Sequence, residues 1–140
     1  MLKGIAKTIS PELLKVLSEM GHGDEIVFAD GNFPAESMGQ RVVRLDGIGM
    51  MDILPGVLKL FPLDTYASEN AVLMEVVKGD TVVPVIWDKY KKTLEKDSGC
   101  KLTQIERFAF YERAQKAYAV VATGEGALYA NIILKKGVVV

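Results

Sequence analysis

The 140-residue sequence contains one histidine and one cysteine, and this scarcity excludes several classes of protein. A lone Cys100 cannot form an internal disulfide, and one cysteine with one histidine cannot supply the ligands of a usual structural zinc site. We therefore expect no metal site. The same count fits a reducing compartment.

Long apolar runs and blocks of like charge are also missing. No stretch of about 18 apolar residues could span a bilayer, and residues 1–7 lack the continuous apolar segment of a signal peptide. The formal net charge is -1, so binding of nucleic acid or of an anionic membrane through a basic face is not indicated. The sequence predicts a soluble cytoplasmic protein with neither nucleic-acid nor membrane partners.

The chain does have enough apolar residues to build one core. Its length lies near the commonest domain size, and its 49% hydrophobic and 25% charged residues are ordinary for a globular protein. No internal repeat, low-complexity tract or linker divides it. We expect one domain over residues 1–140.

Helix signals recur along the chain. Ser10 is a suitable N-cap, Pro11 suits the first helical position, and apolar residues then recur at helical spacing as far as Met20. Gly21 is placed to stop this helix in a left-handed conformation. Further helices are predicted over residues 52–61 (capped by Asp52, with Pro55 in the first turn and Pro62 as the stop) and over residues 111–116. Another helix is predicted after Pro84, with an apolar stripe made of Ile86, Trp87, Tyr90 and Leu94.

Short apolar runs between these helices predict strands. Residues 26–29 form an unbroken apolar run, which is typical of a strand covered on both faces. Further strands are expected over residues 40–46, 71–77, 102–107, 117–123 and 131–135. Alternation of strands and helices predicts an α/β fold, a three-layer α/β/α sandwich around a mostly parallel, mixed sheet.

The only histidine, His22, lies between two glycines ahead of the predicted 26–29 strand, and Asp30 closes that strand. Histidine has an unperturbed pKa of about 6.5, so it is the natural proton donor or acceptor in a site that works near pH 7. The alternative is a loop that only ends a helix. We favour a functional role, because the flanking glycines leave the imidazole free of the packing that usually explains a buried histidine.

Polar residues interrupt the apolar segments at a few further places, namely Asp30, Arg107, Tyr129 and Asn131. With the histidine they supply a base, a carboxylate, a fixed cation, a phenol and an amide. Sugar hydroxyls need donors and acceptors at fixed angles, and an aromatic ring can cover the apolar face of a sugar. The inventory therefore suits a hydroxyl-rich ligand.

Each of these residues also has a purely structural interpretation. Asp30 can bond its own backbone in a turn, and Arg107 can pair with Glu106 or Glu112 at the surface, which is worth about 0–1 kcal/mol. The tyrosine and the asparagine can be ordinary turn and strand residues. Residues 124–126, Gly-Glu-Gly, can be a plain hairpin turn, since no strand–GxGxxG–helix context surrounds them.

Several segments taken together resemble one known family. The sequence is similar nearly end to end to the fucose mutarotase and ribose pyranase family (RbsD/FucU). The matching segments are residues 21–24, Asp30 with Pro34, residues 107–114, residues 123–125 and residues 129–138. The 107–114 segment, Arg-Phe-Ala-Phe-Tyr-Glu-Arg-Ala, favours the fucose mutarotase branch, because the ribose pyranases lack it.

The resemblance implies an isomerase that needs no cofactor and interconverts the α and β anomers of L-fucose by acid–base ring opening and reclosure. The alternatives are a D-ribose pyranase, which interconverts pyranose and furanose forms, and a non-catalytic sugar-binding protein. In the family, the position of His22 donates the proton. The sugar-binding positions correspond to Asp30, Arg107, Tyr129, Ala130 and Asn131.

The length of the predicted strand determines how far apart His22 and Asp30 lie. At about 3.3 Å per residue, a strand over residues 26–29 separates His22 from Asp30 by more than one monosaccharide can bridge. Either the histidine loop folds back or two subunits complete each site. The resemblance implies a ring-shaped homo-oligomer, an octamer or a decamer, with sites at subunit boundaries, and this favours the second option.

Overall fold

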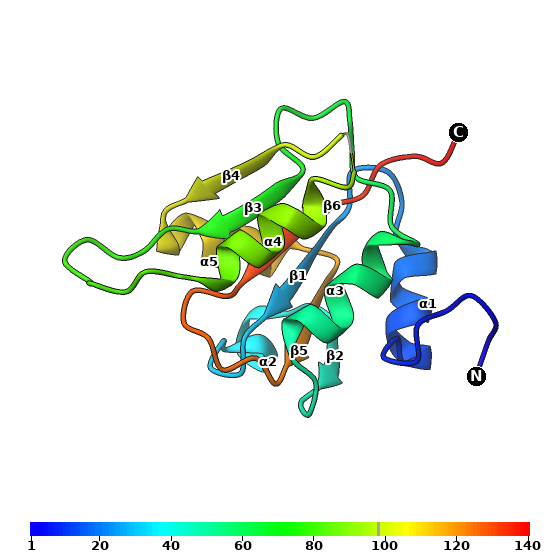
Figure 1. Cartoon of the computed structure of the whole chain (residues 1–140), viewed down its shortest axis with the longest axis horizontal. Helices are drawn as coiled ribbons and strands as arrows, with labels where there is room; N and C mark the ends of the chain where they lie inside the picture. Colours follow the sequence, from blue (N-terminus) through cyan, green and yellow to red (C-terminus); the bar gives the residue numbers. More distant parts are fainter. Residues whose placement is uncertain (98) are drawn as a thin grey trace.

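The computed structural model describes residues 1–97 and 99–140, and six strands of these residues form one sheet (Figure 1). The strands are β1 (Glu25–Ala29), β2 (Val42–Leu45), β3 (Ala71–Met74), β4 (Leu102–Ile105), β5 (Ala119–Thr123) and β6 (Ile132–Lys135). The helices are α1 (Pro11–Glu19), α2 (Ala35–Met38), α3 (Met50–Leu58), α4 (Ile86–Leu94) and α5 (Arg107–Lys116). All six predicted strands are confirmed, although several are shorter than predicted.

The strand order is β2-β5-β1-β6-β3-β4, and β6 runs antiparallel to both of its neighbours. The pairs β1–β5, β2–β5 and β3–β4 are parallel, which confirms the mostly parallel, mixed sheet. The carboxyl ends of the five parallel strands and the amino end of β6 therefore share one edge of the sheet. We call this the carboxyl edge and the opposite one the amino edge.

Helices cover both faces of the sheet, as the predicted three-layer sandwich requires (Figure 1). Side chains of a strand alternate between faces. Ile26 and Phe28 of β1 pack in a core with α1, α3 and α4, whereas Val27 and Ala29 pack in a second core with α2 and α5. Within the described residues, no helix is long and apolar enough to cross a membrane.

Helix α1 begins as its sequence predicts and ends differently. The Ser10 hydroxyl accepts the Leu13 N–H at 3.1 Å, so Ser10 is the N-cap. The prediction of a left-handed Gly21 was wrong, because the helix ends at Glu19 and the loop glycine with positive φ is Gly23, at 88°. The reason is a distant cation. The Lys136 ammonium group donates to carbonyl oxygens in the last turn and at the end of α1, and a left-handed cap is another way to satisfy such carbonyls.

Helix α3 also has a cap that its local sequence does not reveal. The helix begins at Met50, so the prediction that Asp52 caps it and that Pro55 lies in its first turn was wrong. The Met50 N–H donates to Oε2 of Glu125 at 3.0 Å. A carboxylate 75 residues away in the sequence therefore fixes where this helix starts.

The carboxyl edge differs from the prediction at three places. The short helix α2 was not predicted, and α5 begins at Arg107, four residues earlier than expected, because Glu106 accepts the Phe108 N–H at 2.9 Å and caps the helix. Residues 124–126 do not form a hairpin turn, since β1 lies between β5 and β6. A Cβ at Gly124 would lie 2.1 Å from the Asp46 carbonyl oxygen, so this crossing of chains needs glycine.

Candidate active site

Asp30 and Asn131 meet at the carboxyl edge, where β1 ends and β6 begins. The Asp30 N–H donates to Oδ1 of Asn131 at 2.8 Å, and Oδ1 of Asp30 accepts the Asn32 N–H at 2.9 Å. Both side chains are buried. The turn that the sequence offered as a structural role for Asp30 thus exists, and it holds the carboxylate beside the amide.

Burial changes the acidity of the Asp30 carboxyl. Loss of solvation raises its pKa above the ordinary value, and hydrogen bonds from Asn32, Phe33 and Asn131 oppose this rise without cancelling it. The Asp30 carboxylate is therefore a stronger hydrogen-bond acceptor than an exposed aspartate, which suits it to a ligand that offers a hydroxyl.

Tyr129 and Ala130 lie just before Asn131 at the start of β6, and two aromatic side chains of α4 bind their carbonyl oxygens. The indole Nε1 of Trp87 donates to the Tyr129 carbonyl oxygen at 2.7 Å, and the Tyr90 hydroxyl donates to that of Ala130, also at 2.7 Å. Tyr129 has a φ of 57°, the left-handed conformation that non-glycine residues seldom adopt. Strain of this kind persists where surrounding contacts impose it, as they do here.

Arg107 is the first residue of α5 and lines a hollow of about 330 Å³ together with Val77, Lys78 and Phe108. Its guanidinium carbon lies 4.6 Å from the centre of the Phe108 ring. Within residues 1–97 and 99–140, its buried Nε has no hydrogen-bond partner. A buried N–H without an acceptor is costly, so this nitrogen is suited to a ligand oxygen.

The surface pairing that the sequence offered for Arg107 does not form. Glu106 instead accepts backbone N–H groups at the start of α5, and Glu112 pairs with Lys116 at 3.2 Å. The Arg107 guanidinium group lies at the carboxyl edge, and its positive charge slightly opposes the rise that the Asp80 bond causes in the pKa of Tyr129.

His22 lies at the amino edge, on the loop between α1 and β1. Its Nε2 lies 3.1 Å from Oδ1 of Asp64, and its ring centre lies 5.7 Å from that of Tyr66. The imidazole is 47% exposed, whereas the Asp64 side chain is only 7% exposed. The pair thus presents a solvent-facing imidazole on a buried carboxylate.

The Asp64 carboxylate is held in its ionised form. Burial opposes its ionisation, but hydrogen bonds from His22 and from the Tyr66 N–H outweigh this effect and leave its pKa below the ordinary value. An ionised carboxylate accepts a hydrogen bond from Nε2 and stabilises a protonated imidazole. The contact with Asp64 therefore orients the exposed His22 ring.

Backbone hydrogen bonds to Lys136, the residue after β6, fix the loop that carries the histidine. The Gly23 N–H donates to the Lys136 carbonyl oxygen at 2.8 Å, and the Lys136 N–H donates to that of Asp24 at the same distance. These bonds extend the β1–β6 pairing past the end of the sheet. The loop consequently does not fold back along β1.

The structure therefore brings five predicted residues to one edge and leaves one at the other. The residues at the carboxyl edge are Asp30, Arg107, Tyr129, Ala130 and Asn131. The five residues of β1 separate them from His22 by roughly 16 Å at 3.3 Å per residue, which is longer than a monosaccharide.

Among known proteins, one family matches nearly the whole chain. Residues 3–139 match the sequence model of the RbsD / FucU transport protein family. The chain belongs to this family. Membership in the RbsD/FucU family confirms the resemblance noted from the histidine loop and from residues 107–114.

Solved structures of RbsD/FucU proteins are similar over nearly the whole chain. A fucose mutarotase from Streptococcus pneumoniae, crystallised with L-fucose, is 52% identical, with a TM-score of 0.94 over 99% of this chain and 100% of that one. FucU from Bifidobacterium longum is 58% identical, with the same coverage and TM-score. RbsD from Bacillus subtilis, in complex with D-ribose, is 24% identical, with a TM-score of 0.70 over 94% of this chain and 95% of that one, and shares the fold.

Sequence reasoning about this RbsD/FucU chain did not single out Asp64, Trp87 or Tyr90 as site residues. Trp87 and Tyr90 were assigned to the apolar stripe of a helix, yet a buried tyrosine or tryptophan usually directs its polar atom at a partner, and that was the available signal. Asp64 lies two residues after Pro62, in an irregular segment. No local pattern connects it with a histidine 42 residues earlier.

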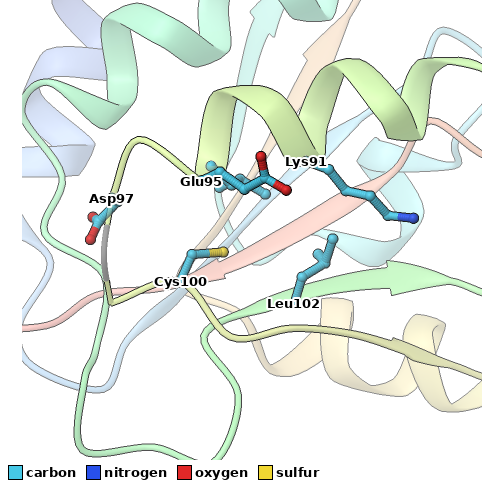
Figure 2. A pocket seen from close by; sticks show the side chains of 6 residues that line it. Lys91, Glu95, Asp97, Cys100 and Leu102 are labelled. Carbon is cyan, nitrogen blue, oxygen red and sulfur yellow. The ribbon is translucent and has the colours of Figure 1, made fainter.

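Another hollow, of about 430 Å³, lies between α4 and β4 (Figure 2). Figure 2 shows the Cys100 and Glu95 side chains at this hollow. Its lining residues are Lys91, Leu94, Glu95, Asp97, Cys100 and Leu102, which are not those predicted to bind a ligand. Burial raises the pKa of the Cys100 thiol, so this sulfur is poorly suited to act as a nucleophile.

Proposed function

We propose that this protein is an L-fucose mutarotase, an isomerase that interconverts the α and β anomers of free L-fucose. The observation that carries the proposal is its 52% identity, over 99% of its length, to the Streptococcus pneumoniae fucose mutarotase whose crystal structure contains L-fucose. The chemistry of the carboxyl edge supports it independently.

Anomer exchange opens the sugar ring to the free aldehyde and closes it on the opposite face. Opening requires a proton at the ring oxygen and removal of a proton from the anomeric hydroxyl, so one acid and one base are sufficient. General acid–base catalysis contributes roughly 10²- to 10⁴-fold in rate. His22 is the acid in this proposal, and Asp64 orients its ring and stabilises the imidazolium.

The sugar binds at the carboxyl edge. Asp30 accepts a hydrogen bond from one sugar hydroxyl, the Asn131 amide orients a neighbouring one, and the unpartnered Nε of Arg107 donates to a third. Tyr129 covers the ring, and Ala130 contributes only backbone, since its side chain is fully buried. This set matches the donors and acceptors that a monosaccharide offers.

A second copy of the chain completes each site. His22 and the sugar-binding residues lie at opposite edges of the sheet, so one copy supplies the carboxyl edge and its neighbour supplies the histidine. Repetition of one such head-to-tail contact closes a ring when the rotation between copies permits. We propose a ring-shaped homo-oligomer, an octamer or a decamer, acting in the cytoplasm.

The test is NMR of L-fucose at anomeric equilibrium with a catalytic amount of protein. Saturation of one anomeric proton should transfer to the other much faster than in buffer, and D-galactose and D-ribose should be compared in the same way. Binding of fucose without faster exchange would make the protein a sugar-binding protein. Faster exchange between pyranose and furanose forms of D-ribose alone would make it a ribose pyranase.

A further inference from the structure

The segment between β3 and α4, residues 75–85, projects beyond the carboxyl edge and meets Tyr129 (Figure 1). The Tyr129 hydroxyl donates to Oδ2 of Asp80 at 2.5 Å, and the Val77 N–H points at the same hydroxyl oxygen at 3.4 Å. Asp80 is thus joined to a sugar-binding residue without belonging to the sugar site itself.

Asp80 is fixed in this position by its own turn. Its Oδ1 accepts the Val82 N–H at 3.0 Å, its N–H donates to the Val77 carbonyl oxygen at 2.9 Å, and Gly79 has a φ of 91°. The turn places one carboxylate oxygen against the backbone and leaves the other for the phenol. The segment therefore presents Oδ2 at a defined place.

The bond has the length of an O–H···O⁻ bond to a charged acceptor, about 2.5–2.7 Å. The Tyr129 bond lowers the pKa of Asp80, and the Asp80 bond raises the pKa of Tyr129. At neutral pH the pair is a protonated phenol donating to an ionised carboxylate. Because a phenol has one hydrogen, its oxygen can meet a sugar hydroxyl only as an acceptor.

Two other groups stabilise negative charge on the Tyr129 hydroxyl oxygen. Arg107 acts on it through its positive charge, and the Val77 N–H is directed at it. Trp87 and the left-handed backbone hold the tyrosine itself beside Asn131. The hydroxyl is thus set to take up one proton while it releases another.

We propose, on the basis of the function proposed above, that Asp80 is the positioning residue for Tyr129 and the final acceptor of the proton that leaves the anomeric hydroxyl. That proton moves to the Tyr129 oxygen as the phenolic proton moves to Asp80. The anomeric oxygen forms the aldehyde C=O, the bond from the anomeric carbon to the ring oxygen breaks, and His22 gives its proton to the ring oxygen. One proton leaves His22 and one arrives at Asp80, and ring closure reverses both transfers.

Asp30 is the competing acceptor at this edge. Its Oδ1 accepts the Asn32 N–H, its own N–H donates to Asn131, and burial raises its pKa, so it can hold a hydroxyl and can also take up a proton. The two carboxylates can be distinguished by replacing each with its amide, because an amide oxygen still accepts a hydrogen bond but takes up no proton at neutral pH.

The experiment measures kcat and KM for L-fucose anomer exchange in the full-length protein and in Asp80→Asn, Tyr129→Phe, the double variant and Asp80→Glu. Asp80→Asn and Tyr129→Phe should each lower kcat by about 10²-fold, within the range of general base catalysis. KM should stay within about twofold for Asp80→Asn. The double variant should be no slower than either single one, and Asp80→Glu should regain part of kcat. Asp88→Asn, which removes an exposed carboxylate from α4, is the matched control and should keep the wild-type kcat.

Titration of the Tyr129 ring carbon by NMR gives a reading that does not depend on activity. Asp80→Asn should lower the pKa of Tyr129, and an unchanged value would overturn the pairing. Wild-type kcat in Asp80→Asn would overturn the proton transfer. If Asp80→Asn keeps the wild-type kcat while Asp30→Asn loses about 10²-fold in kcat, the base is Asp30. Absence of exchange in the wild-type protein would instead reject the proposed function.

Discussion

Nε2 of His22 lies 3.1 Å from Oδ1 of Asp64, and this contact joins the only histidine of the chain to a carboxylate 42 residues further along. The two groups divide the work of an acid. In the proposed mechanism, the exposed imidazole meets the substrate and the buried carboxylate orients the ring and stabilises its charge. Such a division is common where an imidazole must gain and lose a proton.

Replacing His22 with alanine should abolish anomer exchange and leave sugar binding intact. General acid catalysis contributes roughly 10²- to 10⁴-fold, and the residues that we propose to bind the sugar lie at the other edge of the sheet. Saturation-transfer NMR should give the buffer rate, while titration of L-fucose should still show binding. Exchange near the wild-type rate in this variant would remove His22 from the mechanism.

Asp64→Asn should produce a smaller loss than His22→Ala. An amide can still contact Nε2 but does not stabilise an imidazolium, so we expect kcat to fall about 10-fold or more, within the range of general acid catalysis, with KM little changed. Kinetics of the two single variants and of the double variant would test this. A double variant slower than His22→Ala would show that Asp64 acts independently of the histidine.

Mixed oligomers should be more active than either parent variant. If each site takes His22 from one copy and Asp30 from its neighbour, then dissociating and reassembling His22→Ala with Asp30→Asn produces some sites with both native residues. Activity of the mixture should exceed the sum of the two separate preparations. The same two preparations mixed without dissociation serve as the control, and failure of the reassembled protein to gain activity would indicate sites within one chain.

Asp30→Asn should make the protein more stable and less active. Burial raises the pKa of Asp30, so ionisation costs stability as pH rises through that value, whereas below the unfolded pKa of about 3.9 the penalty is absent. The variant should have a higher Tm than wild type at pH 7, and the two should converge at about pH 3. Loss of a charged acceptor should lower kcat/KM about 10- to 100-fold.

Asp52→Asn is the matched control for this stability measurement, since Asp52 is an exposed carboxylate in the first turn of α3. Its Tm should be measured at the same pH values as those of wild type and Asp30→Asn. A lower Tm for Asp30→Asn at pH 7 would show that the carboxylate is stabilising in its ionised form.

Lys136→Met should destabilise the fold and loosen the histidine loop. The ammonium group donates to the carbonyl oxygens of Leu17 and Met20 at 2.7 and 2.5 Å, and hydrogen bonds to a charged group contribute about 1.5–3 kcal/mol. Urea denaturation should show a loss of that size, and amide exchange at Gly23 should accelerate. Lys15→Met, which removes only a surface pair with Glu19, should change stability little.

Local patterns in the sequence predicted most of the secondary structure. The Ser10 cap, the apolar run of β1 and the stripe of α4 each depend on neighbouring residues, so they could be recognised before folding was considered. The starts of α3 and α5 were misplaced, because their caps are Glu125 and Glu106, and glutamate is not among the preferred N-cap residues.

The residues of the candidate site also fall into two groups, those that the sequence could identify and those that it could not. His22, Asp30 and Arg107 could be named because the family resemblance rests on the segments that contain them. Asp64 and Asp80 could not, because nothing in the neighbouring sequence distinguishes them from surface aspartates. Each becomes a site residue only through a contact with a side chain more than forty residues away.

The sequence by itself determined the α/β layering, the family and the residue types available for acid–base chemistry, because these follow from composition, periodicity and short motifs. Only the tertiary structure decided which of those residues meet. The tertiary structure places Asp30 in contact with Asn131, Asp64 with His22, and Asp80 with Tyr129. It also places His22 at the opposite edge of the sheet from Asp30. The physical reason is that strand pairing fixes which residues lie at each edge, and that pairing connects segments too distant for any local pattern to record.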